Sequence, residues 1–197
     1  ALEIGSAAHC LILEGEEAFQ RDFIVCSARK GSIKHKEVQQ NNPGKTIITG
    51  ATYTNIRKMK ESLLKNKGIA KILSEQGQPE LSVFWEYKGQ KFKCRFDYIT
   101  KSGIIVDLKT CQCANPTTFL GDIKKWSYEL QSAYYSWAAE QTLGFKNAPF
   151  VFIVASKNYP YECSMLGLGP RSLDKSRAKL FQIIDELIEK NKNNKWE

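Results

Sequence analysis

Apolar and charged side chains alternate along residues 91–98, in the middle of the chain. One set of positions holds Phe92, Cys94, Phe96 and Tyr98, and the other holds Lys91, Lys93, Arg95 and Asp97. Successive side chains of a β-strand point to opposite faces, so the pattern predicts a strand with one apolar and one charged face. The segments at 81–87 and 104–110 also have strand composition, and the short turns KGQ and TKSG separate the three. We therefore expect an antiparallel meander of three strands.

Helical spacing of apolar residues and short apolar runs predict the remaining elements. Helices are expected at residues 1–19, 55–73, 119–144 and 172–190, with Ile56, Met59, Leu63 and Leu64 forming the apolar stripe of the second. Strands are expected at 22–27 and 149–156, a loop or mobile helix at 28–42, and a solvated tail at 191–197. This order of elements predicts an α/β fold in which a central mixed β-sheet is flanked by helices.

Length and charge narrow the class of protein. The 197 residues suit a single domain over residues 1–197, large enough to bury a core without disulfides. The longest apolar runs are far too short to cross a bilayer, so no membrane association is expected. The formal net charge of +8 favours a polyanionic partner such as nucleic acid. The chain starts at Ala1 with a helical pattern and no signal peptide, which indicates a processed, trimmed or excised segment.

Cysteine usage and one glycine-rich stretch exclude two other kinds of site. The six cysteines are scattered, which favours free thiols in a reducing, cytoplasmic compartment. Cys111 and Cys113 could form half of a metal site, but only Cys163 lies downstream, so free thiols are the better interpretation there as well. The sequence GKT at 44–46 is not a phosphate-binding P-loop, because Gln39 stands where that motif needs its first glycine.

Two acidic residues and a lysine fall where the second and third predicted strands meet. Asp97 lies on the charged face close to the turn, and Asp107 follows in the next strand after a short return. Two carboxylates with incomplete coordination suit Mg²⁺ or Mn²⁺ that also holds a substrate phosphate and water. Lys109 shares a face with Asp107, where an amine can orient or deprotonate the attacking water and stabilise negative charge. The spacing thus predicts phosphodiester chemistry.

The same residues resemble a known nuclease superfamily. An Asp followed ten residues later by Asp-Leu-Lys at a hairpin resembles the PD-(D/E)XK nucleases. GSAAH (Gly5 to His9) resembles the GxxxH helix of the RecB-like branch, and QSAYY (Gln131 to Tyr135) resembles its QxxxY motif. Together with ELSVFWEY, CRFDYI and IIVDLKT, these stretches look like the RecE-type exonucleases, or exonuclease VIII, over roughly residues 2 to 155.

The resemblance implies a fold, an activity and a set of site residues. The fold would be the PD-(D/E)XK core, and the activity a Mg²⁺-dependent 5′-to-3′ exodeoxyribonuclease that resects double-stranded DNA ends for recombination, with Mn²⁺ able to substitute. A single-strand annealing protein and a ring-shaped homo-oligomer are implied as partners. The implied metal ligands are His9, Asp97, Asp107 and the carbonyl of Leu108. The implied catalytic residues are Asp97, Asp107, Lys109, Gln131, Tyr135 and, more weakly, Glu80.

Two other functions remain open at this stage. The first is a structure-specific or restriction-like endonuclease on the same core, and the second is a DNA-binding module without catalysis. Taken singly, each residue also has an ordinary structural explanation: His9 could pack or cap a helix, and Asp97 could be a solvated hairpin acid. The ordered combination of five stretches favours the nuclease.

Overall fold

The computed structural model describes residues 2–194, and it consists of two compact units built from interleaved segments. The first unit comprises residues 1–74, 108–115 and 153–164; the second comprises 75–107, 116–152 and 165–197. Residue 1, where the first predicted helix starts, and residues 195–197 of the predicted tail lie outside the described residues. The single domain predicted over residues 1–197 stays a prediction.

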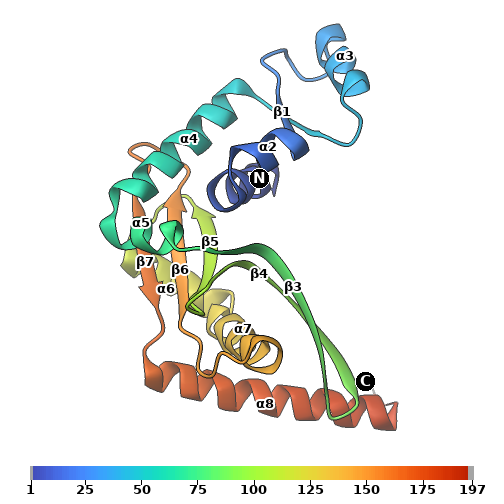
Figure 1. The fold of residues 1–197 in the computed structure, drawn as a ribbon, viewed down its shortest axis with the longest axis vertical. Coiled ribbons are helices and arrows are strands. Elements are labelled where there is room, and N and C mark those ends of the chain that lie inside the picture. The colour runs from blue at the N-terminus through green and yellow to red at the C-terminus, as the bar shows by residue number, and fades with distance from the viewer. Residues whose placement is uncertain (1, 195–197) are drawn as a thin grey trace. The chain divides into compact units, whose positions relative to one another are not determined.

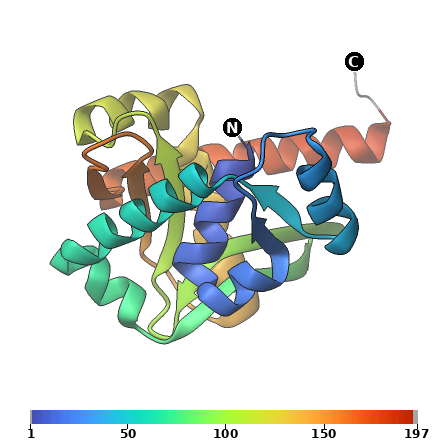
Figure 2. The ribbon, with the colours of Figure 1, turned by 90° about the horizontal axis from the view of Figure 1, so that it is seen from above.

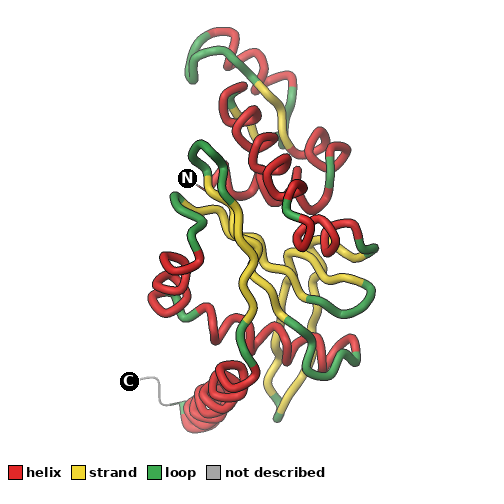
Figure 3. The backbone as a smooth tube through the Cα atoms, turned by 90° about the vertical axis from the view of Figure 1, so that its left-hand side faces the viewer, coloured by secondary structure: helices red, strands yellow, loops and turns green. Residues whose placement is uncertain are grey.

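The structure contains a five-stranded mixed sheet flanked by helices, which confirms the predicted fold class (Figure 3). The hydrogen bonds from Ile105 N to Pro149 O and from Lys157 N to Cys111 O advance in the same direction along β5 and β6, so these two strands are parallel. The other pairs near the site, β3 with β4 and β4 with β5, are antiparallel. The strand order is β3 (Gly77–Tyr87), β4 (Gln90–Thr100), β5 (Ile105–Cys111), β6 (Phe150–Ser156) and β7 (Cys163–Gly167).

The predicted meander is present, and its first two strands form a long hairpin in the second unit. At the tip of the hairpin, Lys88 Nζ lies 2.7 Å from Asp185 Oδ1 of α8 (Pro170–Asn193). Beside it, the Asn191 amide donates a hydrogen bond of 2.8 Å to Gln90 Oε1. Figure 1 shows the hairpin curving toward the C-terminal half of α8. The helix therefore supports the far end of the hairpin.

Aromatic side chains fill the space beneath this hairpin. Trp137 of α7 (Tyr128–Leu143) makes edge contacts with Trp85, Phe92 and Phe181, at centroid distances of 5.1, 5.2 and 5.4 Å. Such aromatic pairs each add about 0.5–1.5 kcal/mol beyond the area they bury. The apolar face predicted for the middle strand thus packs against α7 and α8, and its position fixes where the charged face lies.

The N-terminal segment of the first unit, residues 2–74, is mostly helical, with a short parallel pair of strands, β1 and β2. Its core contains Leu11, Ile56, Met59 and Leu63, all nearly inaccessible to solvent, and α1 packs against α4 (Figure 2). Its elements are α1 (Leu2–His9), the π-helix η1 (Cys10–Glu14), α2 (Glu16–Asp22), β1 (Phe23–Val25), α3 (Ile33–Asn41), β2 (Thr46–Ile48), α4 (Gly50–Lys65) and α5 (Lys67–Ser74).

Three predicted helices are each interrupted in the structure. The helix expected at 119–144 is two helices, α6 (Pro116–Lys125) and α7, because Ser127 adopts a left-handed conformation with φ 53°. The helix expected at 55–73 breaks at Asn66, whose side chain accepts hydrogen bonds from Gly68 N and Ile69 N and caps α5.

The remaining corrections concern single positions and short segments. Gly15, with φ 95°, separates η1 from α2 inside the helix expected at 1–19. Leu64 was placed on the buried stripe of its helix, which is wrong, because 49% of it is exposed. The short strands β2 and β7 were not predicted. Within residues 2–194, no helix combines the length and the apolar character that crossing a membrane requires.

Candidate active site

Three carboxylates come from three neighbouring strands of the second unit. The register of β4 and β5 pairs Ile99 with Ile105 and Tyr98 with Val106, and the next step sets Asp97 opposite Asp107. The register of β3 and β4 pairs Pro79 with Tyr98 and Leu81 with Phe96, which sets Glu80 opposite Asp97. Residues directly opposite each other in an antiparallel pair point to the same face. Glu80, Asp97 and Asp107 therefore form one row across the sheet.

Glu80 is held in an uncommon backbone conformation in the first half of β3. Its φ is 49°, which is rare for a non-glycine residue and costs of order 1–3 kcal/mol. Oxygens of Glu80 and Asp97 lie within 4.8 Å of one another, and Glu80 Oε2 lies 3.0 Å from Arg95 Nε. Two facing carboxylates repel each other unless a cation lies between or beside them. The Arg95 guanidinium supplies part of that compensation.

Asp107 is buried and is held by a hydrogen bond from α7. Only 1% of the residue is exposed, and the Gln131 side-chain amide donates a bond of 2.6 Å from Nε2 to Asp107 Oδ1. Burying a carboxylate is costly unless hydrogen bonds or opposite charges compensate it. Gln131 therefore fixes the orientation of this carboxylate toward the row.

Tyr135 follows Gln131 by one turn of α7 and packs beside the same row. Its ring meets Phe96 edge-on at a centroid distance of 5.6 Å. Burial raises the pKa of the Tyr135 hydroxyl to about 12, while a hydrogen bond with Gln131 opposes the shift and the charges of Asp107 and Asp97 add to it. The hydroxyl is thus protonated at neutral pH and can act as a hydrogen-bond donor.

Cys94 lies on the apolar face of β4 near these acids. Burial is the main cause that raises the pKa of its thiol to about 12, and the negative charges of Asp97 and Asp107 contribute. A thiol with such a high pKa is a poor nucleophile at neutral pH. The site is consequently suited to carboxylate chemistry and not to thiolate chemistry.

The other predicted site residues belong to the first unit. His9 is half-buried and is the last residue of α1. In the same helix, a Cβ added at Gly5 would lie 3.9 Å from Thr110 Oγ1, so α1 runs beside the end of β5. Leu108 and Lys109 directly follow Asp107 in β5; Leu108 is buried and Lys109 is half-buried. Metal binding by His9 and Leu108 and catalysis by Lys109 stay predictions.

The donor set of the row fits a divalent cation. Mg²⁺ and Mn²⁺ prefer carboxylate oxygens and keep open positions for water and phosphate. Glu80 and Asp97 supply such oxygens within 4.8 Å of one another, and Asp107 follows in the same row; a cation would relieve the repulsion between the facing carboxylates.

Sequence reasoning missed two contacts close to the row. Arg95 was interpreted as part of a charged strand face, but it pairs with Glu80, as their positions on a common face allow. Tyr134, flanking the QxxxY motif, donates a hydrogen bond of 2.8 Å to the carbonyl of Lys93. The pairing register of the hairpin could have indicated the contact between Arg95 and Glu80 in advance, whereas the bond from Tyr134 depends on how α7 packs against β4.

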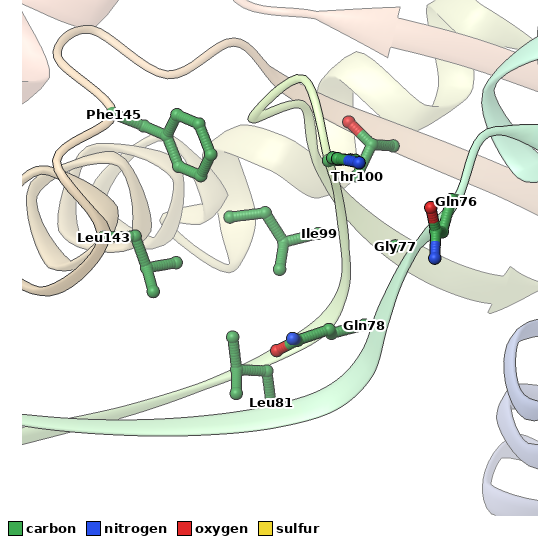
Figure 4. A pocket seen from close by; sticks show the side chains of 9 residues that line it. Gln76, Gly77, Gln78, Leu81, Ile99, Thr100, Leu143 and Phe145 are labelled. Carbon is green, nitrogen blue, oxygen red and sulfur yellow. The ribbon is translucent and has the colours of Figure 1, made fainter.

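A separate cavity of about 360 Å³ lies at the base of the hairpin, also in the second unit (Figure 4). The side chains of Leu81, Ile99, Leu143 and Phe145 converge on it, and Gln78 and Thr100 lie at its edge. No carboxylate is among its lining residues in the described part of the chain, so these side chains offer no anionic ligand for a hard metal ion.

Comparisons with known proteins bear on the family and the fold of the chain. A family model described as a PDDEXK-like domain of unknown function (DUF3799) matches residues 1–197. The crystal structure of a protein named "Putative exonuclease" from Eubacterium rectale superposes with a TM-score of 0.68 at 18% identity, covering 100% of this chain and 69% of that one. A crystal structure of SSO0001 gives a TM-score of only 0.33 at 14% identity, covering 91% and 83% of the two chains. No curated protein matches the sequence.

Proposed function

We propose that this chain, which belongs to the family of PDDEXK-like domains of unknown function (DUF3799), is a metal-dependent deoxyribonuclease of the RecE type. It would degrade double-stranded DNA from its ends in the 5′-to-3′ direction and so prepare single strands for recombination. The observation that carries the proposal is the row of Glu80, Asp97 and Asp107 across three adjacent strands. The name of the E. rectale protein and the net charge of +8 also support action on DNA ends.

Each residue of the site has a distinct part in this proposal. Asp97 and Asp107 would be metal ligands, Glu80 a further acidic ligand, and Gln131 would keep Asp107 in its binding orientation through the bond of 2.6 Å. His9 and the Leu108 carbonyl would complete the ligand set. When bound, Mg²⁺ supplies charge neutralisation at the scissile phosphate and activation of water.

Lys109 would act on the attacking water and on the developing charge. Because it stands two residues after Asp107 in the same strand, its amine projects from the same face as the carboxylate. Such an amine can accept a proton from the water or donate a hydrogen bond to the phosphate oxygens in the transition state. Tyr135, with its protonated hydroxyl, would donate a hydrogen bond to the DNA backbone or to the site.

A cleavage assay with labelled DNA tests the reaction class. Linear duplexes carrying a label at the 5′ or the 3′ end, and a covalently closed circle, are incubated with and without Mg²⁺. We expect early release of the 5′ label, long-lived 3′-labelled strands, an intact circle and no reaction without metal. A cut circle would indicate the endonuclease, and binding without cleavage would indicate a non-catalytic DNA-binding module.

Two substitutions in β5 test the division of roles. Asp107→Ala should abolish cleavage and weaken Mg²⁺ binding in calorimetry, because a ligand is lost. Lys109→Ala should abolish cleavage while Mg²⁺ binding persists. Equal loss of metal affinity in both variants would contradict the role given to Lys109. A ring-shaped homo-oligomer and an annealing-protein partner belong to the same proposal, and sedimentation analysis tests the first of them.

A further inference from the structure

The face that carries the acidic row continues along the hairpin toward its tip. Ser82 pairs with Arg95 and Phe84 pairs with Lys93, so these four residues point to the same side of the sheet as Glu80 and Asp97. Each step of two residues along a strand advances about 6.6–6.8 Å. Within the second unit, the pair next to the carboxylates therefore contributes the cation Arg95, and the following pair contributes the aromatic Phe84 and the cation Lys93.

Phe84 is unusually exposed for an aromatic residue in the middle of a strand. Its exposed fraction is 72%, whereas Trp85 and Phe92 on the other face of the hairpin pack against Trp137. The side chain of Arg95 is 68% exposed. Charged residues on a strand protect against aggregation, but an exposed phenylalanine among them has the opposite effect. The aromatic position therefore requires another explanation.

A hollow of about 460 Å³ lies beside Phe84 on the same hairpin. Ser82, Phe84, Lys93, Arg95 and Tyr134 contribute to its lining. The bond from the Tyr134 hydroxyl to the Lys93 carbonyl holds α7 against the strand at this place. The hollow thus combines an aromatic surface with two cations and a rigid backbone.

We propose that this hollow binds the unpaired end of a DNA strand, with a base stacked on Phe84 and phosphates at Lys93 and Arg95. The inference rests on the proposed nuclease function and adds how the substrate is held beside the row. Single strands are bound by stacking platforms combined with cationic tracks, and two cations next to one accessible ring form the smallest such combination. Bases inside a duplex are already stacked on both faces and cannot use Phe84 in this way.

Binding is measured with Ca²⁺ in place of Mg²⁺, because its looser coordination suits binding without turnover. The probes are a blunt duplex and the same duplex with a short unpaired end that contains 2-aminopurine, whose fluorescence falls on stacking. We expect Phe84→Ala to weaken binding of the unpaired end about tenfold or more and to abolish the fluorescence change. Phe84→Trp should retain the affinity and the fluorescence change. Lys93→Ala should reduce by about 0.7 the slope of the logarithm of the binding constant against the logarithm of the salt concentration.

Matched variants separate this site from general surface effects. Trp126→Ala removes another exposed aromatic residue, and Lys179→Ala another exposed cation of the second unit; both should bind the unpaired end as the wild type does. Melting temperatures establish that all variants are folded.

Three outcomes would overturn the inference. If Phe84→Ala binds the unpaired end as tightly as the wild type, while the wild type cleaves DNA, the inference fails alone. If Phe84→Ala loses affinity equally for the blunt duplex, the face binds duplex DNA and the inference fails. If the wild type neither binds nor cleaves DNA, the proposed function fails with it.

Discussion

The two faces of β4 carry opposite kinds of side chain. On the inner face, Phe96 is fully buried and Cys94 and Tyr98 are less than 10% exposed. On the outer face, Arg95 is largely exposed and Asp97 faces two other carboxylates. One strand thus carries packing on one side and charge on the other. Substitutions on the inner face should mainly change stability, and substitutions on the outer face should mainly change activity.

The largest effect is expected from Asp97→Asn on the outer face. The amide keeps the size of the side chain but removes the charge of the proposed metal ligand, so the cleavage rate should fall at least a thousandfold, corresponding to about 4 kcal/mol. Glu86→Gln is the control, because Glu86 lies on the same face opposite Lys91 but far along the hairpin from the row. Rates with Mg²⁺ and urea unfolding are measured for both. Wild-type activity of Asp97→Asn would refute the assigned role.

The inner face should respond in the opposite way. Phe96→Ala removes a fully buried ring that contacts Tyr135, and it should lower the free energy of unfolding by about 3–5 kcal/mol. Phe96→Leu should cost less, because most of the volume is kept. Urea titrations measure both. If Phe96→Ala unfolds at the wild-type urea concentration, the inner face does not have the packing role described here.

Gln131 connects the two kinds of surface, because it reaches from a packed helix to a carboxylate of the row. Gln131→Leu should lower the cleavage rate about 10–100-fold and weaken Mg²⁺ binding, and it should also lower the melting temperature, because the buried Asp107 carboxylate loses a hydrogen-bond donor. Gln141→Leu, at an exposed position of the same helix, is the control. Calorimetry with Mg²⁺ distinguishes a positioning role from a structural one. An unchanged metal affinity would mean that the hydrogen bond does not position Asp107 for the metal.

The smallest effect concerns alkaline pH. The folded chain holds the Cys94 thiol protonated up to about pH 12, whereas the thiol ionises near its ordinary value of 9.0 when unfolded. The free energy of unfolding therefore includes a contribution from this thiol that is complete below pH 9 and is lost as the pH rises from 9 toward 12. The stability of Cys94→Ala should fall less steeply over that range than the wild type. Cys113→Ala removes an exposed thiol, and its free energy of unfolding should fall with pH as that of the wild type does.

The sequence predicted the parts of the fold and site that depend on local patterns. The alternation in β4 and the short turn before β5 were sufficient to bring Asp97 and Asp107 to the same place, because a short turn restricts the register. Gln131 and Tyr135 were identified only through the resemblance to nucleases. Helical periodicity could not have shown that Gln131 meets Asp107, because that contact depends on how α7 packs against the sheet.

Other features depended on tertiary context. The break at Ser127 separates α6 from α7 within a segment, WSYE, that contains neither glycine nor proline. Glu80 was placed just before its strand, whereas β3 begins at Gly77 and includes Glu80 in a left-handed conformation. Gly77 itself allows this early start, since a Cβ there would lie 2.4 Å from the Ile99 carbonyl oxygen. Such close approaches are invisible to single-residue propensities.

The interleaving of the two units along the chain has a consequence for synthesis on the ribosome. The first unit includes residues 108–115 and 153–164 as well as the N-terminal segment, so it cannot be completed until the ribosome has passed residue 164. Nascent domains generally fold from the N-terminus as they emerge, but here the early helices must wait for strands made much later. Contacts between such distant segments also slow folding. A premature stop within α8 would therefore come late enough to leave the first unit complete and only the second unit truncated.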